Sequence, residues 1–317
     1  MRLAALPRLL LPLLLVDCGS RGDLFIGELF THADGGSAGN SSGGGGAEAT
    51  GGAVALAGTS GSSTDLGGSS DLGGAEAGGA AGSNGDDDCV TGETPPAGSL
   101  IHRYSFDGTG TVATDSISGK DGEIIKAQLT GSGAVVMSGA DGEYVDLPNG
   151  IISALTDVTV VTWTNWVDGA GYGRVFDFGS NENGEGEGNT GRSYMAVLPK
   201  TGFENQAKPG LGAELKVPGF STVQLASTEN MKDRAAQVSL VFKGGVSASL
   251  YIDSNLLATK PTAIKPSDID DRNNWIGQSQ YKDNPPYEGG FEEFRIYNVA
   301  LNACQLHTLL VNGRESP

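Results

Sequence analysis

One segment decides the fold: residues 274–301 read NWIGQSQYKDNPPYEGGFEEFRIYNVAL. Residues 291–299 of this segment alternate in character. The apolar side chains Phe294 and Ile296 fall on one face together with Glu292, and the residues between them fall on the other. The lead-in contains paired prolines and paired glycines, which favour turns. The segment predicts a half-buried strand that closes a β-sheet domain, and it indicates a fold rather than an activity.

The chain before this segment has the same character back to residue 100. Short alternating stretches, such as LIHRYSF at 100–106 and DVTVVTWTNWV at 157–167, are separated by Gly, Asp and Asn turns. QVSLVF at 237–242 turns at Lys-Gly-Gly into SASLYID, which predicts a hairpin, and a second turn follows at 253–255. Only residues 303–310 have a brief helical pattern. The expected fold is an all-β antiparallel sandwich.

The first hundred residues cannot form a packed core. Between residues 34 and 85, 38 of 52 residues are Gly, Ala or Ser. Such a composition buries too little apolar surface to offset the entropy of an ordered chain. We therefore expect a disordered tether over residues 19–98 and a folded domain over residues 99–317.

The N-terminus indicates export. Two arginines and a run of leucines too short to span a bilayer are typical of a signal peptide, here residues 1–18. The stretch ending at Cys18 resembles the lipobox of bacterial lipoproteins, although Asp17 stands where that motif has a small residue. The sequence thus predicts either lipidation of Cys18, with the protein at the bacterial outer membrane or cell surface, or a secreted protein cut elsewhere, near Gly22. A lipid anchor is the only expected attachment to a membrane.

The remaining cysteines, Cys89 and Cys304, lie at the two edges of the predicted domain. In an oxidising compartment they are expected to form a disulfide that joins the two ends of the domain. The alternative is two free thiols.

The charge of the chain excludes one class of partner. The formal net charge is −18, and each side of residue 98 contributes about half of it. Nucleic-acid binding draws its affinity from cations that neutralise phosphates, so nucleic acid is not an expected partner.

Several segments in the expected order resemble the laminin-G-like domains of the concanavalin A-like lectin/glucanase superfamily. These segments are YSFDG at 104–108, DSISG at 115–119, the strand VTVVTW at 158–163 and the closing segment quoted above. Glu292 stands where the family has Asp, and Cys304 is an addition. The resemblance implies a jelly-roll sandwich of two antiparallel sheets.

The sequence gives no sign of catalysis. Glucanases similar to this family carry the motif ExDxxE or ExDxE on one strand, and the chain lacks it. The nearest acidic pairs, Glu143 with Asp146 and Glu292 with Glu293, place their members on opposite faces, whereas a retaining glycosidase needs two carboxyl groups on one side. We expect a protein that is not an enzyme.

The resemblance also implies a possible cofactor. The first and last strands of such domains run close together, so Asp107, Asp115 and Glu292 are expected to converge and to bind calcium through carboxylate oxygens. The alternative is that Asp107 and Asp115 cap turns through their own backbone.

The residues expected to bind a ligand surround one loop. Trp275, Tyr281 and Tyr287 supply planar rings and Gln278 supplies an amide, which is the mixture that sugar recognition uses. The alternative is that Trp275 and Tyr287, which belong to the family's structural signature, serve only to pack the fold.

These features together predict an exported, non-catalytic module that binds a carbohydrate or another surface ligand. Its partner would be a glycan or an envelope protein. The alternatives are a structural envelope protein that contacts other proteins and, with less support, a glycoside hydrolase whose acids converge from separate strands.

Overall fold

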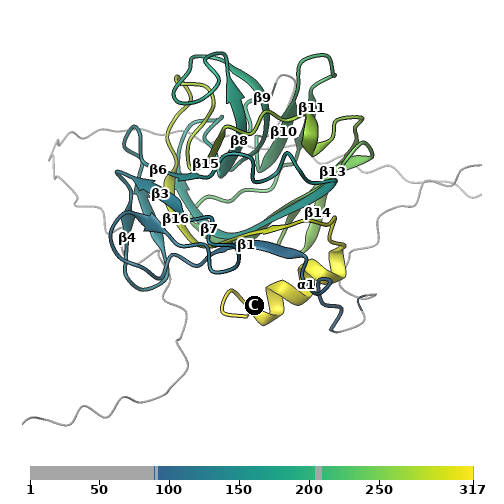
Figure 1. The fold of residues 1–317 in the computed structure, drawn as a ribbon, viewed down its shortest axis with the longest axis horizontal. Coiled ribbons are helices and arrows are strands. Elements are labelled where there is room, and N and C mark those ends of the chain that lie inside the picture. Colours follow the sequence, from purple (N-terminus) through teal and green to yellow (C-terminus); the bar gives the residue numbers. More distant parts are fainter. Residues whose placement is uncertain (1–88, 90–91, 204–208, 317) are drawn as a thin grey trace, which may run out of the picture. The chain divides into compact units, whose positions relative to one another are not determined.

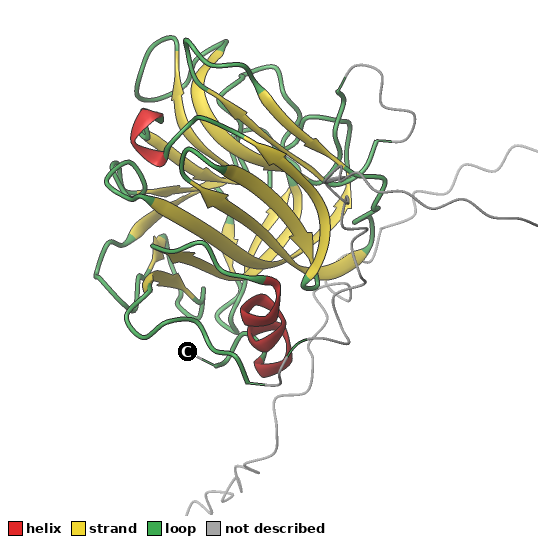
Figure 2. Ribbon diagram, turned by 90° about the vertical axis from the view of Figure 1, so that its right-hand side faces the viewer, coloured by secondary structure: helices red, strands yellow, loops and turns green. Residues whose placement is uncertain are grey.

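The structure, a computed structural model, describes Cys89 and residues 92–203 and 209–316. The predicted signal peptide, the lipidation at Cys18 and nearly all of the predicted tether lie outside these residues. The described chain forms two antiparallel sheets that pack face to face, and Figure 2 shows the two layers with a helix beside them. The predicted all-β sandwich is confirmed.

The first sheet contains eight strands in the described residues. Seven follow the order β14-β13-β12-β7-β16-β5-β4, and β1 pairs with the end of β16 that extends beyond β5. The strands are β1 (Leu100–Tyr104), β4 (Gln128–Leu129), β5 (Val135–Ser138), β7 (Asp157–Asp168), β12 (Arg234–Lys243), β13 (Ser247–Ile252), β14 (Asn255–Pro261) and β16 (Glu288–Tyr297). The strand predicted from the closing segment, β16, therefore has neighbours on both sides along its length.

The second sheet has the order β11-β10-β9-β8-β15-β6-β3-β2. Its strands are β2 (Val112–Ala113), β3 (Gly122–Ile125), β6 (Tyr144–Leu147), β8 (Phe176–Asn181), β9 (Gly191–Leu198), β10 (Gly212–Lys216), β11 (Val223–Ala226) and β15 (Asn273–Ile276). Figure 1 shows β8, β9 and β10 stacked over β1, β7 and β16 of the first sheet. The chain crosses between the two layers several times, so that each sheet is built from separate parts of the sequence, as in a jelly roll.

The predicted hairpins are confirmed. Lys243 pairs with Ser247 at the end of β12 and β13, and Ile252 pairs with Asn255 at the start of β14. Asp253 and Ser254 have φ values of 46° and 62°, so both central residues of the second turn are left-handed. Such a turn matches the twist of the strands that it joins, which explains why two residues are enough.

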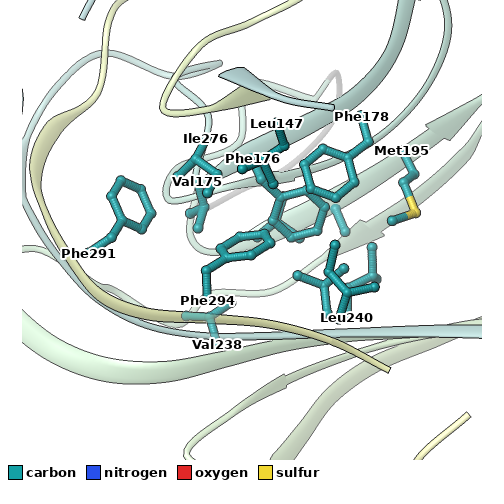
Figure 3. Close-up of a cluster of buried hydrophobic side chains, with 14 of the residues drawn as sticks. Leu147, Val175, Phe176, Phe178, Met195, Val238, Leu240, Ile276, Phe291 and Phe294 are labelled. Atoms are coloured by element: carbon teal, nitrogen blue, oxygen red, sulfur yellow. The ribbon is translucent and has the colours of Figure 1, made fainter. Parts of the chain in front are cut away.

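The core lies between the sheets and is rich in aromatic rings. The ring centroids of Phe176 and Phe178, both from β8, lie 5.8 and 5.9 Å from that of Phe294 on β16. Met195 and Leu240 pack around them (Figure 3). Burial of each such side chain contributes roughly 1.5–3 kcal/mol, so this cluster is a main source of the cohesion between the layers.

The predicted half-buried character of the closing strand is wrong, for two reasons. A β-bulge between Phe291 and Glu293 shifts the alternation, so that Phe291 and Phe294 both enter the core. The opposite face is buried as well, because a second apolar cluster covers it. That cluster consists of Val161, Val241, Tyr297, Leu301, Leu306 and Leu309.

The helix α1 (Ala303–Asn312) supplies this second cover. The side chain of its N-cap, Asn302, accepts a hydrogen bond from the backbone N–H of Gln305. The side chain of Gln305 in turn accepts a hydrogen bond from the backbone N–H of Asn302. Figure 1 shows α1 on the side of β1 that faces away from β8 and β9. The predicted helix is confirmed. Neither helical segment of the described chain has the length and apolar character needed to cross a membrane.

The start of the domain is attached to the same helix. Cys89 and Cys304 form a disulfide with their Cα atoms 5.1 Å apart, which confirms the predicted pairing. Glu93 accepts a hydrogen bond of 2.7 Å from the side chain of Asn302. The two ends of the domain are therefore joined covalently and by hydrogen bonds.

A buried charge cluster lies on the outer face of β16. Glu293 is 1% exposed, and its Oε1 accepts hydrogen bonds of 2.6 Å from the Nε atoms of Arg103 and Arg295. The guanidinium of Arg295 also donates to the carbonyls of Arg314 and Ser316 and stacks 4.9 Å from the ring centroid of Trp163. Glu293 thus serves two guanidinium groups, from β1 and β16, and the C-terminal segment supplies backbone carbonyls as further acceptors.

We predict that Glu293→Gln lowers the free energy of unfolding by about 3 kcal/mol, because it leaves two guanidinium groups without a counter-charge in a buried site. Chemical denaturation measures the change. The matched control is Glu292→Gln, which alters the neighbouring, partly exposed acid that pairs with Arg314 and should cost less than about 1 kcal/mol. Equal losses in the two variants would contradict the assigned role of Glu293.

We predict that Cys304→Ser lowers the free energy of unfolding by roughly 2–5 kcal/mol, because the disulfide closes a very long loop in the unfolded chain. A reducing agent should shift the denaturation midpoint of the wild-type protein and leave that of the variant unchanged. A wild-type midpoint that is insensitive to complete reduction would show that the bond does not stabilise the domain.

Candidate functional site

The outer face of the second sheet carries a row of polar side chains. Cross-strand pairing aligns Trp275 on β15 with Asp146 on β6 and with Asp177 on β8. The row continues to Glu123 at one end and reaches Glu214 at the other. The alternate positions of these strands face the core, so this row must point away from it. The outer face of the second sheet is therefore polar and acidic along this row.

Loop 277–287 covers the middle of this row. Gln280 is fully buried, and its backbone N–H donates to Asp177 Oδ2 at 3.1 Å. Its side-chain amide donates to the carbonyl of Asn273 at 3.0 Å and accepts a bond of 3.0 Å from the Asn273 side chain. The loop is therefore fixed to the sheet by polar contacts, not laid over it loosely.

Asp177 is the buried charge beneath this loop. Arg174 Nε donates to Asp177 Oδ2 at 2.9 Å, and both side chains are almost fully buried. Burial raises the pKa of Asp177 to about 6, against the opposing effects of Arg174 and of the Gln280 N–H. The other carboxylate oxygen, Oδ1, has no hydrogen-bond partner among the described residues. A fully buried carboxylate in such a network stabilises the loop but is closed to a ligand.

Trp275 forms the rigid base of a surface hollow. The ring is 3% exposed, and it packs edge-on against Tyr144 with centroids 5.6 Å apart. Its indole N–H donates to Asp146. Burial raises the pKa of Asp146 to about 6, and the nearby carboxylates of Glu123 and Glu185 add to this effect against the bond from Trp275. The indole is thus held in one orientation by a ring on one side and an acceptor on the other.

The hollow above this ring has a volume of about 140 Å³. We call it the Trp275 hollow. Three segments far apart in the sequence supply its walls: the turn before β6, loop 181–191 and loop 277–287. Its lining residues are Asp141, Gly142, Glu187, Gly188, Trp275, Gln278, Ser279, Lys282, Asn284 and Pro286.

The chain enters the hollow through a glycine. Gly277 follows β15 with a φ of 87°, and a Cβ atom there would lie 2.3 Å from the sulfur of Met137. Only glycine satisfies both the left-handed backbone and this contact. The position of the next residue, Gln278, at the rim of the hollow is therefore set by the fold.

The polar side chains of the hollow are largely uncommitted. Among the described residues, the side chains of Gln278, Lys282 and Glu187 have no hydrogen-bond or ion-pair partner. Asn284 uses its amide N–H to donate to Ser279 Oγ at 2.8 Å, which leaves its carbonyl oxygen free. Donors and acceptors of both charges thus converge on one small concave surface.

Only two of the four predicted ligand residues meet in this hollow, namely Trp275 and Gln278. Tyr287 is fully buried; its hydroxyl donates to the Asn165 carbonyl and lies 2.7 Å from the Thr164 hydroxyl. The structure does not support a ligand role for Tyr287 and favours the alternative of packing. Trp275 offers only an edge, because so little of its ring is exposed.

Tyr281 lies beside the hollow and does not line it. Its ring packs edge-on against Tyr194 with centroids 5.9 Å apart, and its hydroxyl accepts a hydrogen bond of 2.8 Å from Lys216 Nζ. This tyrosine therefore holds loop 277–287 against β9 and β10.

The predicted calcium site is not assembled. Glu292 occupies the bulge of β16 and pairs with Arg314, so it does not point at a core edge as its place in the sequence pattern indicates. Within the described residues, no group of three His, Cys, Asp or Glu side chains is close enough to hold a metal ion. The three acids, Asp107, Asp115 and Glu292, do not form such a group. Calcium binding elsewhere stays a prediction.

Asp115 instead fixes a turn, as the alternative interpretation holds. Its Oδ1 accepts the backbone N–H groups of Arg103 and Ile117, and its Oδ2 accepts the Ser118 hydroxyl. Burial opposes ionisation, but the bond from Ser118 and the backbone bonds hold the pKa of Asp115 at about 2. The imidazole of His102 lies 2.8 Å from Oδ2. This carboxylate has no free oxygen to offer a cation.

The sequence did not predict several residues of the hollow. Asp141 and Glu187 lie about 90 to 140 positions before the loop that they face, and nothing in their local pattern marks them. Lys282 could have been predicted, because it is the only cationic residue in loop 277–287. A prediction needs the order of the strands to place these three segments together.

We predict that Asp146→Asn stabilises the protein above about pH 4, with the full gain reached by about pH 6. The folded state holds the pKa of Asp146 above its unfolded value of 3.8, so the wild-type side chain destabilises the fold progressively as pH rises from about 4 to about 6, and the loss is constant above that. The asparagine amide does not ionise, so the variant avoids this loss of stability, and its carbonyl oxygen can still accept a hydrogen bond from the Trp275 N–H. The side chain is partly exposed, so the gain is about 1 kcal/mol, or a melting temperature roughly 2–4 °C higher.

Melting curves of both proteins between pH 3.5 and pH 8 check this expectation. They should coincide below about pH 4, diverge between about pH 4 and pH 6, and stay apart by a constant amount at higher pH. Glu123→Gln, across the strand pair, should give a smaller gain. A constant offset at every pH would mean that ionisation of Asp146 is not the cause.

Comparison with solved structures supports the architecture. Domain 4 of the extracellular arabinanase AbnA from Geobacillus stearothermophilus, solved with arabinotriose, aligns with a TM-score of 0.51 and 16% identity over 66% of this chain and 96% of that domain. Trypanosoma rangeli sialidase, in complex with a difluoro nononic acid, aligns with a TM-score of 0.52 and 16% identity. That match covers 70% of this chain and 36% of the sialidase. At this identity, the likeness concerns the fold alone.

The comparison with curated proteins gave no match. A family model does match: Laminin_G_3, described as the concanavalin A-like lectin/glucanases superfamily, covers residues 138–307. This range is more than half of the chain and contains both sheets' central strands and all three segments of the Trp275 hollow. The chain therefore belongs to the Laminin_G_3 family of the concanavalin A-like lectin/glucanase superfamily.

Proposed function

We propose that this domain is a non-catalytic carbohydrate-binding module whose ligand contacts lie in the Trp275 hollow. One observation carries the proposal: uncommitted polar side chains of two separate loops converge over a rigid indole. Clefts that bind small ligands combine a preformed base with a few polar groups that fix orientation. Sugar hydroxyls both donate and accept hydrogen bonds, so they suit the mixture of amide, carboxylate and ammonium groups found there.

The rigidity of the hollow supports binding without a large entropic cost. Trp275 is held by Tyr144 and Asp146, and Gly277 sets the path of the chain into Gln278. A site whose base is already ordered loses less conformational freedom when a ligand arrives. The small volume favours a single sugar unit or the end of a chain over the middle of a long polymer.

The absence of catalysis belongs to the same proposal. The outer row contains acids from separate strands, as a hydrolase on this fold would require. However, Asp177 is fully buried beneath loop 277–287. Glu214 is 8% exposed, and both of its oxygens accept hydrogen bonds, from Tyr194 and Gln224. Neither of these two carboxylates can approach a glycosidic bond, which leaves only Glu123 and Asp146 of the row open and supports a binding role.

Display outside the cell is also part of the proposal. The Cys89–Cys304 disulfide supports it, because such bonds persist in oxidising compartments. The signal-peptide pattern and the Gly, Ala and Ser composition of the N-terminal segment support it from the sequence. In this arrangement, the tether gives the module reach from its point of attachment.

We predict that Gln278→Ala weakens glycan binding by about 5–10-fold, as expected for the loss of one or two hydrogen bonds. The first measurement is a glycan array probed with the full chain, once with calcium and once with chelator. Titration of the best ligand then compares the wild-type protein with the variant. The matched control is Gln128→Ala on β4, an exposed glutamine whose side chain has no partner among the described residues.

Gln128→Ala should bind as the wild-type protein does. Removal of calcium by the chelator should leave binding unchanged, because none of the contacts proposed in the Trp275 hollow involves a metal. An array that is blank in both conditions would overturn the proposal, and retention of envelope proteins in excess free sugar would then favour the protein-binding alternative.

A further inference from the structure

A second concave site lies on the other side of Tyr281 from the Trp275 hollow. It is a shallow groove of about 430 Å³ at the start of β9 and the end of β10, which lie side by side in Figure 1. Its walls include Arg192, Lys216, Phe220 and Thr222. We call it the Lys216 groove. Loop 181–191 borders both sites, through Glu187 and Gly188 in one and through Glu182 and Thr190 in the other.

Lys216 is held in place by neutral groups. Its Nζ donates to the Tyr281 hydroxyl at 2.8 Å and to the Gly191 carbonyl at 3.1 Å, and it lies 5.4 Å from the centroid of the Tyr281 ring. An ammonium group has three donors, so one remains. Neutral partners and a ring face orient the cation but do not cancel its charge. No ion pair joins Lys216 to Glu214 of the same strand, whose two carboxylate oxygens accept hydrogen bonds from Tyr194 and Gln224.

Arg192 is the second cation of the groove, and it differs from every other described arginine. It is exposed and has no ion-pair partner among the described residues. The other six described arginines all pair with a carboxylate: Arg103, Arg174, Arg234, Arg272, Arg295 and Arg314. In a chain with a net charge of −18, acids are plentiful, so an unpaired guanidinium next to an unpaired ammonium is a specific local feature.

The acid at the edge of the groove is committed elsewhere. Glu182 accepts hydrogen bonds from the backbone N–H groups of Asn189, at 2.5 Å, and Thr190, at 2.6 Å. These bonds, led by that from Asn189, lower the pKa of Glu182. Its oxygens fix loop 181–191 and leave Arg192 without a partner. The groove thus holds two cations that form no ion pair among the described residues, beside one ionised carboxylate whose oxygens are bonded to the backbone of its own loop.

The groove also offers an apolar surface. Phe220 is 39% exposed, and its turn is closed by a hydrogen bond of 3.1 Å from its N–H to the Val217 carbonyl. An exposed ring in a concave site can pack against the apolar face of a sugar ring. A guanidinium fork matches the two oxygens of a carboxylate. The groove therefore combines the two contacts that a charged sugar requires.

We infer that the Lys216 groove binds a sugar that carries a carboxylate, with Arg192 and Lys216 on the carboxylate and Phe220 on the ring. The inference rests on the proposed carbohydrate-binding function and adds a second subsite with its own ligand class. Both sites flank loop 277–287, so one branched or acidic glycan can engage both.

The test compares acidic oligosaccharides with their own methyl esters. Oligosaccharides of galacturonic and glucuronic acid, each with its ester, are titrated against the full chain at low and at 0.5 M salt. We expect at least one acid to bind about tenfold or more tightly than its ester at low salt, with the preference reduced at high salt because the charges are screened. Arg192→Ala should abolish the preference for the acid, and Arg192→Lys should retain part of it.

The controls separate this inference from the proposed function. Arg192 has no described partner, so its variants should melt with the wild-type protein, and Lys260→Ala on β14 should keep the preference. Neutral glycan binding with no preference for any acid would overturn the Lys216 groove alone. A preference that survives Arg192→Ala would also overturn it. Failure to bind any glycan, neutral or acidic, would overturn both proposals.

Discussion

The burial of β16 on both faces is the constraint on which the structure depends. One face closes the aromatic core through Phe291 and Phe294, and the other carries Glu293 and Arg295 beneath the C-terminal segment. A bulge makes this possible, because it shifts the alternation between Phe291 and Glu293. The strand also pairs with β7 on one side and with β5 and β1 on the other. The strands beside β16 and the helix that follows it are therefore placed against a strand that cannot move without exposing apolar or charged groups.

The sequence predicts this architecture well where the pattern is local. The hairpins around Gly244 and Ser254 and the terminal helix follow from turn residues and periodicity, and the Cys89–Cys304 bond follows from position in the chain. The closing strand shows the limit. Alternation alone places Glu292 beside Phe294, and only the bulge, which depends on pairing with β7, moves it out towards Arg314. The alternation of a sequence cannot predict a bulge such as this one, because the bulge arises from pairing with a strand that is distant in the chain.

The site is predictable only in part, for a related reason. Trp275 and Gln278 are found because they are near each other in the chain, but Asp141 and Glu187 join them through strand order. Tyr287 has the composition of a ligand residue and the environment of a core residue, since its hydroxyl is satisfied by Asn165 and Thr164. Residue type indicates what a side chain can do, whereas burial decides whether a ligand can reach it.

The polar row on the second sheet connects the fold to the sites. An exposed row of carboxylates would suit catalysis, but loop 277–287 covers its centre: Gln280 donates to Asp177, and the Tyr281 hydroxyl meets that of Tyr194. What remains open lies on the two sides of the loop. On one side are the free amides and carboxylates over Trp275, and on the other are Arg192 and Lys216 without acidic partners. Because the same loop separates and orders both surfaces, a change that loosens its contact with Asp177 should disturb the two sites together, whereas a change at either rim should disturb only one.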